Sequence, residues 1–509
     1  MSERTERTFF GHPIGLGTLF FTEMWERFSY YGLRPLLVLF MSAALLDGGF
    51  GFDRTAAAAI VGIYAGLIYL APLPGGWIAD RWLGLQRTIW WGALLITFGH
   101  MAIGVSGLAG QGRSGKMAFF AGLGLIVLGT GLLKPNISAI VGDLYPEGGA
   151  RRDAGFSIFY MGINLGSFLG QLVTGYLGEQ VGWHWGFGAA GIGMFFGLVV
   201  FTIYAPKTLR GIGTDIVRDP DPMVQARRES RVKQVVTAGA IAVVLLFALA
   251  ASGSLALDPV AIGSSMAIVL LALAVLFFTV VLLDKTLSSL ERRQVVVILV
   301  LFLAAAVFWA AFEQAPTSLN LFAKDFTDRT IGGWEIPATW FQSVNSFFII
   351  LLAPVFAALW TAMGRANREI SAPAKFTWGL IFAGIAFALM IIPANAIVAS
   401  QGALLVSPLW LVGSYFLQTI GELSLSPVGL SSMTKLSPRK YVGQMMGIWF
   451  LAASIGNLIA GLVGGRVDPE NLQQTPQLFT FTAGFLFAAA ILLALMIVPI
   501  RRMMARTSL

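Results

Sequence analysis

Ionisable side chains interrupt several long apolar runs of this sequence, and their types could support binding or proton transfer. If these runs cross a membrane, each such group costs roughly 2.5–3.5 kcal/mol on insertion scales, so it usually faces a cavity. The strongest cases are Glu23, Glu26, Arg27, Arg34, Lys134, Glu313 and Glu422. These acids and bases nearly neutralise one another around a shared polar centre, which could bind a charged solute or carry protons.

The densest group of these residues lies in the stretch 23–34. At about 100° per residue, its polar and aromatic side chains fall within an arc of roughly 140° on one helix face. They are Glu23, Glu26, Arg27, Tyr30, Tyr31 and Arg34. Two interpretations stay open: a buried ion-pair face that locks helices together, or a cavity wall that binds a charged solute or protons.

A second candidate is Lys134, which is followed directly by Pro135. Proline lacks an amide donor and clashes with the preceding turn, so we expect a discontinuous helix beside a binding site here. The alternative is that Lys134 snorkels to the inner membrane surface. For Asn164, buried among small residues, an interhelical hydrogen bond is as compatible with the sequence as a ligand contact.

The remaining candidates lie in the second half of the chain. Trp309 and Glu313 share a helix face at i, i+4. Burial favours the protonated form of a carboxyl group and a neighbouring arginine favours the ionised form, so alternation between the two would make Glu313 a proton carrier. Glu422 lies near the helix breaker Pro427. A single aromatic residue such as Trp449 faces lipid or core more often than a ligand.

The composition indicates which elements position these groups. Of 509 residues, 56% are hydrophobic and 12% are charged, whereas soluble domains are roughly 25% charged. Recurring runs of about 20 apolar residues predict a polytopic α-helical membrane protein. A soluble enzyme, a disordered scaffold and an ordinary nucleic-acid binder are excluded. The chain has no cysteine and three isolated histidines, so thiol chemistry is excluded and we expect no metal site.

The apolar runs predict fourteen spans. They cover residues 14–44, 55–79, 88–108, 117–141, 154–177, 184–205, 235–255, 260–283, 294–320, 338–362, 375–395, 404–434, 441–464 and 476–499. Most of the 34 Lys and Arg residues fall on alternate connections, which predicts that both termini are cytoplasmic.

We expect four parts along the chain: a six-helix bundle over 1–205, a basic cytoplasmic linker over 206–234, an accessory two-helix hairpin over 235–283 and a second six-helix bundle over 284–509. The linker is expected to lie near anionic lipid headgroups.

Together these motifs resemble the proton-dependent oligopeptide transporter family of the major facilitator superfamily. The matching pieces, in order, are Glu23-x-x-Glu26-Arg27-Phe28-x-Tyr30-Tyr31-Gly32, the stretch 75–80, Lys134-Pro135-Asn136, Phe159-Tyr160-x-x-Ile163-Asn164-x-Gly166-Ser167, Phe312-Glu313-Gln314 and Gly421-Glu422. The resemblance covers about residues 11–500 and implies the fourteen-helix bacterial form of that fold. Eukaryotic members carry a histidine in the second span, and this span has none.

The resemblance implies roles for individual residues. Arg27 and Lys134 would bind the terminal carboxylate of a peptide, and Glu422 would bind its terminal ammonium. The residues that would hold its backbone or line its side-chain pockets are Asn164, Asn345, Tyr30, Tyr31, Tyr69, Tyr160, Trp309 and Trp449. Glu23, Glu26 and Glu313, together with Arg27, would relay protons. Arg34–Glu313 and Lys134–Glu422 would be ion pairs that break and re-form.

The expected function is therefore proton-coupled uptake of di- and tripeptides across the cytoplasmic (inner) membrane by alternating access. The alternative is proton-coupled transport of another small anion or zwitterion, such as nitrate or a peptide-like drug. The protein is not expected to be an enzyme, and the proton is its coupling ion in place of a cofactor. Its expected partners are peptides, protons and membrane lipid, without nucleic acid, and we expect a monomer.

Overall fold

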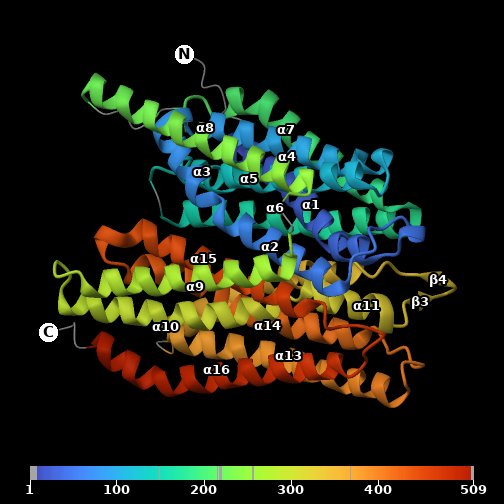
Figure 1. The fold of residues 1–509 in the computed structure, drawn as a ribbon. Coiled ribbons are helices and arrows are strands. Elements are labelled where there is room, and N and C mark those ends of the chain that lie inside the picture. The colour runs from blue at the N-terminus through green and yellow to red at the C-terminus, as the bar shows by residue number, and fades with distance from the viewer. Residues whose placement is uncertain are drawn as a thin grey trace. The chain divides into compact units, whose positions relative to one another are not determined.

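The computed structural model describes residues 8–147, 149–214, 216, 220–254, 257–366, 368 and 370–505, and this part of the chain is almost entirely helical (Figure 1). The helices are α1 (Ile14–Ser42), α2 (Arg54–Leu70), α3 (Pro72–Ile78), α4 (Leu85–Ser106), α5 (Arg113–Asp143), α6 (Gly149–Tyr176), α7 (Trp183–Thr208), α8 (Pro222–Ser252), α9 (Pro259–Leu283), α10 (Ser289–Phe312), α11 (Asn320–Phe326), α12 (Trp340–Arg365), α13 (Ala372–Ala399), α14 (Leu409–Leu436), α15 (Val442–Gly464) and α16 (Gln474–Ala505). Two short antiparallel hairpins pair β1 (Thr8–Phe9) with β2 (His12–Pro13) and β3 (Thr330–Ile331) with β4 (Trp334–Glu335).

Each of the fourteen expected spans corresponds to one long helix or to consecutive helices. Within the described residues, 12 helices are long and apolar enough to cross a membrane. The other two long helices are α1 and α14, of 29 and 28 residues. They fall outside that set because they contain the polar and ionisable residues singled out above, which lower their apolarity.

The basic segment 206–234 is partly helical, which differs from the expected linker. Helix α8 begins at Pro222, earlier than the expected start at residue 235. The Asp221 side chain accepts a hydrogen bond of 2.8 Å from the Met223 backbone N–H, and Pro222 occupies the first helical turn. Both are helix-start signals, so the local sequence favours an early start. Residues 215 and 217–219 of this segment lie outside the described part.

The chain forms two compact units. Unit 1 comprises Met1–Leu36, Ala43–Gly51 and Leu70–Asp258, and unit 2 comprises Leu37–Ser42, Phe52–Tyr69 and Pro259–Leu509. Most of α2 therefore belongs to unit 2. In that unit the Ser454 hydroxyl of α15 donates a 2.9 Å hydrogen bond to the Gly66 carbonyl of α2. The expected division at residue 205 remains a prediction about functional halves.

The core of unit 1 is built around α4, which packs against α5 and α7 (Figure 1). Two glycine pairs let the α4 and α5 backbones approach closely. A Cβ on Gly92 would lie 2.6 Å from the Gly129 carbonyl oxygen, and one on Gly99 would lie 2.7 Å from that of Gly122. The pairs are seven residues apart on each helix, so they recur on one face. Small residues that allow close backbone packing are typical of membrane helices.

In unit 2, α13 packs between α14 and α16, and α10 packs against α15. Helix α9 also packs on α15, where a Cβ on Gly263 would lie 3.2 Å from the Leu462 side chain. Helix α8, by contrast, belongs to unit 1 and contacts α5. The two helices of the expected accessory hairpin are therefore each attached to a different unit.

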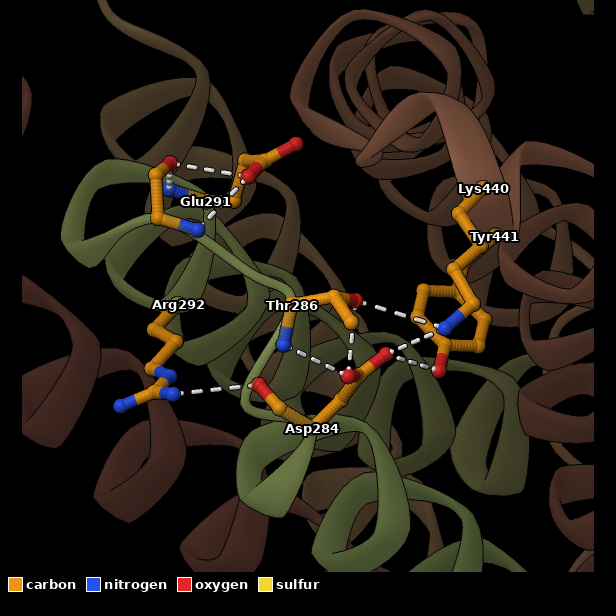
Figure 2. A network of polar contacts seen from close by, with 7 residues as sticks. Asp284, Thr286, Glu291, Arg292, Lys440 and Tyr441 are labelled. Carbon is orange, nitrogen blue, oxygen red and sulfur yellow. Dashed lines mark hydrogen bonds and ion pairs between the residues drawn. The ribbon is translucent and has the colours of Figure 1, made fainter.

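The connection between α9 and α10 is fixed to the start of α15 by Asp284 (Figure 2). Its carboxylate accepts hydrogen bonds of 2.7 Å from Lys440 Nζ and from the Tyr441 hydroxyl, and of 2.8 Å from the Thr286 backbone N–H. These donors hold the pKa of Asp284 well below its ordinary value, with the Lys440 contact the largest cause. A capping box between Ser288 and Glu291 then starts α10.

Candidate functional site

In unit 1, α1 carries a buried cluster of one base between two acids. Arg27 Nε lies 3.0 Å from Glu23 Oε1 and also forms an ion pair with Glu26. The exposed fractions of Glu23, Glu26 and Arg27 are 3%, 0% and 3%. Burying charges is costly unless they are paired and hydrogen-bonded. The middle turns of α1 thus hold a concentrated, largely desolvated charge group.

Several polar atoms of this cluster lack hydrogen-bond partners within the described part of the chain. They are Glu23 Oε2, both carboxylate oxygens of Glu26, and Nε and Nη2 of Arg27. The Arg27 ion pairs are close approaches without hydrogen-bond geometry at Nε. Buried polar groups in native proteins are normally satisfied, so such a set indicates a place for a proton, a water molecule or a ligand.

Aromatic rings continue the same face of α1. The Tyr30 ring centroid lies 5.5 Å from Arg27 Cζ and 6.0 Å from Arg34 Cζ, within cation–π range. The Tyr31 ring is 4.9 Å from that of Tyr30 in an edge-to-face arrangement. The expected face of α1 is thus formed as a continuous ladder of charges and aromatic rings.

Helix α6 positions this ladder through two glycines. A Cβ on Gly166 would lie 2.1 Å from the Met24 carbonyl oxygen, and one on Gly170 would lie 2.3 Å from that of Phe28. Asn164 is 5% exposed, and its Nδ2 donates a 3.0 Å hydrogen bond to the Tyr160 carbonyl of the same helix. Among the described residues this amide therefore bonds within α6, so the interhelical alternative is not realised. The Tyr160 side chain is 43% exposed.

The expected break in the helix around Lys134 is wrong. Helix α5 runs without interruption from Arg113 to Asp143 with Pro135 inside it. Beside this proline, Asn136 Nδ2 donates a 2.6 Å bond to the Leu132 carbonyl of the same helix and a 3.4 Å bond to that of Gly75. Lys134 is half-buried on this continuous helix.

In unit 2, the break occurs at Glu313 instead. Helix α10 ends at Phe312, a π-helical turn spans Ala315–Leu319, and α11 begins at Asn320. Pro316 lies in that turn and offers no backbone donor. Gln314 holds the break, because its Nε2 donates to the Thr482 hydroxyl at 3.2 Å. Glu313, which is 4% exposed, thus terminates a helix inside a membrane span.

One turn before this break, Trp309 packs tightly against α15. A Cβ on Gly456 would lie 2.5 Å from the Trp309 Cβ, so a glycine is needed there. Trp309 is 8% exposed, and its indole Nε1 has no hydrogen-bond partner among the described residues. A buried indole donor without a partner is suited to a ligand acceptor.

Glu422 lies in a small hydrogen-bonded group between α12 and α14. Asn345 Nδ2 donates a 3.2 Å bond to Glu422 Oε2 and a 2.9 Å bond to the Thr419 hydroxyl. Thr419 in turn donates to the Tyr415 carbonyl at 2.7 Å. The amide of Asn345 thereby fixes the orientation of the carboxylate. The structure brings Asn345 and Glu422 into contact, while their expected roles toward a peptide stay predictions.

Two further expected residues have different surroundings within unit 2. The Trp449 ring packs on Gly429, where a Cβ would lie 2.1 Å from the ring, and it is 6% exposed. Tyr69 lies near the end of α2 and is half-buried. The expected ion pairs Arg34–Glu313 and Lys134–Glu422 each join residues of different units, and they stay predictions. Within the described residues no group of three metal-ligating side chains occurs.

Thr419 and Gly170 were not among the expected site residues. Thr419 lies three residues before Glu422, so one helical turn places both on the same side. Gly166 and Gly170 are four residues apart, a spacing that indicates close packing of membrane helices. Both spacings can be seen in the sequence once Glu422 and Arg27 are assumed to be site residues.

The fold and these clusters define a class of protein: a multi-pass helical membrane carrier with buried opposite charges. Comparison with known proteins is more specific. A family model described as the POT family matches residues 86–478. Peptide transporter YePEPT of Yersinia enterocolitica subsp. palearctica is 48% identical over 501 residues, which are 98% of this chain and 97% of that relative.

Two further proteins agree. The di-/tripeptide transporter of Lactococcus lactis subsp. cremoris is 39% identical over 462 residues, 90% of each chain. A crystal structure of a peptide transporter POT in complex with sulfate has a TM-score of 0.88 and 42% identity, covering 98% of this chain and 97% of that one. This chain belongs to the POT family, whose members are transporters rather than enzymes. It is a multi-pass protein of the cytoplasmic membrane with the expected fold.

Proposed function

We propose that the protein takes up di- and tripeptides together with protons, by alternating access. The observation that carries this proposal is the buried Glu23–Arg27–Glu26 cluster, whose polar atoms lack partners among the described residues. Family membership supports the transport of peptides, because the similar proteins above are named as peptide and di-/tripeptide transporters. Both termini are proposed to be cytoplasmic.

Unit 1 is proposed to bind the carboxylate end of the peptide. Arg27 presents a buried guanidinium with Nη2 lacking a partner within the described chain, and guanidinium groups pair well with carboxylates. Lys134 adds a second cation on the continuous helix α5. The exposed Tyr160, with Tyr30 and Tyr31, supplies aromatic walls, and Asn164 supplies an acceptor for the peptide backbone.

Unit 2 is proposed to bind the ammonium end. Glu422 is an acid whose second oxygen is held by Asn345, so the carboxylate is oriented before a ligand arrives. Trp309 is proposed to offer the peptide both its indole N–H donor and the flat face of its ring. Trp449 and Tyr69 complete the proposed aromatic pockets. Fixed charges at both ends with aromatic walls between them suit substrates that share termini but differ in side chains.

Proton coupling is assigned to Glu23, Glu26 and Glu313, with Arg27 as their partner on α1. Glu313 directly follows the end of α10, and a π-helical turn separates it from α11. A helix break gives a carboxyl group freedom to change environment, which a proton carrier requires. Arg34–Glu313 and Lys134–Glu422 are proposed to break and re-form during the cycle. All of these residues belong to one chain, so a monomer suffices.

The test is a double-mutant cycle on the two ends of the substrate. Binding of dialanine, N-acetyl-dialanine and dialanine amide would be measured on the wild type and on Glu422→Gln and Lys134→Ala. Each blocked terminus should weaken wild-type binding about tenfold or more, as expected for a lost charged hydrogen bond. The acetyl penalty should vanish in Glu422→Gln, and the amide penalty should shrink in Lys134→Ala, where Arg27 remains as the second cation. Nitrate binding without dialanine binding would instead favour another small anion.

A further inference from the structure

A cavity of about 730 Å³ lies in unit 2, away from the residues assigned to transport. It is bordered by the end of α13, the connection between α15 and α16, and the first half of α16. Its lining changes in character along its length. Arg466, Gln473 and Gln477 lie at one end, and Phe481, Gly484 and Phe485 follow along α16. Cavities of this size are typical of specific small-molecule sites.

The polar end of the cavity carries one cationic side chain, that of Arg466. Arg466 follows the last turn of α15 by two residues, and its side chain is exposed. No ion pair or side-chain hydrogen bond joins Arg466 to any described residue, and its backbone N–H bonds to the Val463 carbonyl. The side-chain amides of Gln473 and Gln477 are further donors on the same rim. An anion with several acceptor oxygens matches this set of donors.

The apolar end of the cavity follows one face of α16. Gln477, Phe481, Gly484 and Ala488 are spaced by four, three and four residues, which places them in one row. Phe481 and Phe485 are 70% and 59% exposed, and a Cβ on Gly484 would meet nothing within 4 Å. Gly484 therefore leaves open space beside two large aromatic side chains.

The length of this row fits one membrane leaflet. At 1.5 Å per residue, the rise from Gln477 to Ala488 is roughly 16 Å, while half of the hydrocarbon core is about 15 Å. An amphiphile with a compact anionic head and one extended hydrocarbon chain would match both ends at once. A second protein chain would have to present a buried anion next to a narrow apolar ridge, which is a more demanding match.

We propose that this cavity binds one anionic phospholipid, with its phosphate on Arg466 and one acyl chain over Gly484, along the stacked rings of Phe481 and Phe485, whose centroids are 6.1 Å apart. A lipid held there would contact α13, α16 and the connection between α15 and α16 at the same time. An anionic lipid is preferred over a zwitterionic one, because the cationic headgroup of a zwitterionic lipid would place a second positive charge beside Arg466. Phosphate and guanidinium form bidentate hydrogen bonds, which favours arginine at this position.

The test uses purified full-length protein and two lipids with identical chains, phosphatidylglycerol and phosphatidylcholine. Native mass spectrometry would count retained lipids, and thermal unfolding would measure the stabilisation. We expect the wild type to prefer phosphatidylglycerol about tenfold. Arg466→Gln should remove this preference, and Gly484→Phe should reduce retention of both lipids. Because the Gly484 Cβ position is open, the larger residue should fold. Inorganic phosphate alone should change neither readout.

Arg113→Gln is the matched control, since it removes another exposed arginine at the start of α5. It should leave the lipid preference unchanged. Unchanged phosphatidylglycerol retention in both Arg466→Gln and Gly484→Phe would overturn the proposal. The proposal would also be overturned if the wild type formed a dimer that either variant disrupts. That result would assign the cavity to contact with a second copy of the chain. Dialanine binding by Arg466→Gln should equal that of wild type, which separates this site from the transport function.

Discussion

The two polar clusters of the molecule are built differently. On α1, Glu23, Glu26 and Arg27 lie on one unbroken helix, and several of their polar atoms lack partners among the described residues. Around Glu422, the carboxylate is held by Asn345, and α10 ends at Phe312, directly before Glu313. The first cluster gathers ion-paired groups with unused hydrogen-bonding atoms on one continuous helix. The second combines an oriented carboxylate with a broken helix. This difference suggests that binding and movement are divided between them.

Two prolines sharpen this comparison. Pro135 lies beside Lys134 inside a continuous α5, while Pro316 lies in a π-helical turn that separates α10 from α11. The Asn136 side chain, next to Pro135, bonds to the Leu132 carbonyl within the same helix. At Pro316 the side-chain bond of Gln314 reaches α16 instead. A proline next to a charge therefore does not by itself predict a break.

The largest effect is expected for Glu313→Gln. Gradient-driven uptake should fall about 100-fold or more, because the amide cannot carry a proton. Exchange of peptide against peptide should be nearly unchanged, since peptide termini are assigned to other groups. Both rates would be measured in the same liposomes, with the exposed Glu470→Gln as control. Equal loss of uptake and exchange would contradict the division between binding and coupling.

Lys134→Ala should have the next largest effect, on binding. Loss of a charged hydrogen bond to the peptide carboxylate costs roughly 1.5–3 kcal/mol, so dialanine affinity should weaken about 10- to 150-fold. Titration calorimetry would measure it, and the exposed Lys435→Ala provides the control. Unaltered affinity would mean that Lys134 reaches the membrane surface instead of the substrate.

Gly166→Ala tests how α6 supports the α1 cluster. The added Cβ would lie 2.1 Å from the Met24 carbonyl, so the helices must separate. Overpacking of this kind costs about 1–3 kcal/mol, and the melting temperature should drop. Gly124→Ala on α5 adds the same methyl group where nothing lies within 4 Å, so it should have little effect. Equal melting temperatures for the two variants would argue against close packing of α1 on α6.

Asp284→Asn should have the smallest effect, and that effect is on thermal stability. Asp284 is assigned no role in either polar cluster. The pKa of Asp284 is lowered by its hydrogen bonds with Lys440, Tyr441 and Thr286. Its stabilising contribution is therefore complete above the ordinary carboxyl pKa and is lost only as pH falls through the lowered value. The variant should melt slightly earlier, by the same amount at pH 5 and pH 8. A deficit that changes between these pH values would contradict this assignment.

The sequence predicts the helices well because a bilayer leaves few alternatives for long apolar runs. Their ends and breaks depend on local hydrogen bonds, so the early start of α8 at Pro222 and the continuity of α5 at Pro135 were not predicted. The α1 ladder follows from helical periodicity alone. By contrast, the Asn345–Glu422 contact joins residues far apart in the chain. The family resemblance indicated both residues as parts of the site but did not predict their contact.

The most direct test of the account is uptake of labelled dialanine by liposomes that contain the purified protein. Uptake would be compared with an inward proton gradient, without a gradient, and with a gradient collapsed by an uncoupler. The account predicts accumulation above the outside concentration only with the intact gradient. Equal accumulation in all three conditions, or none with folded protein, would contradict proton-coupled peptide uptake.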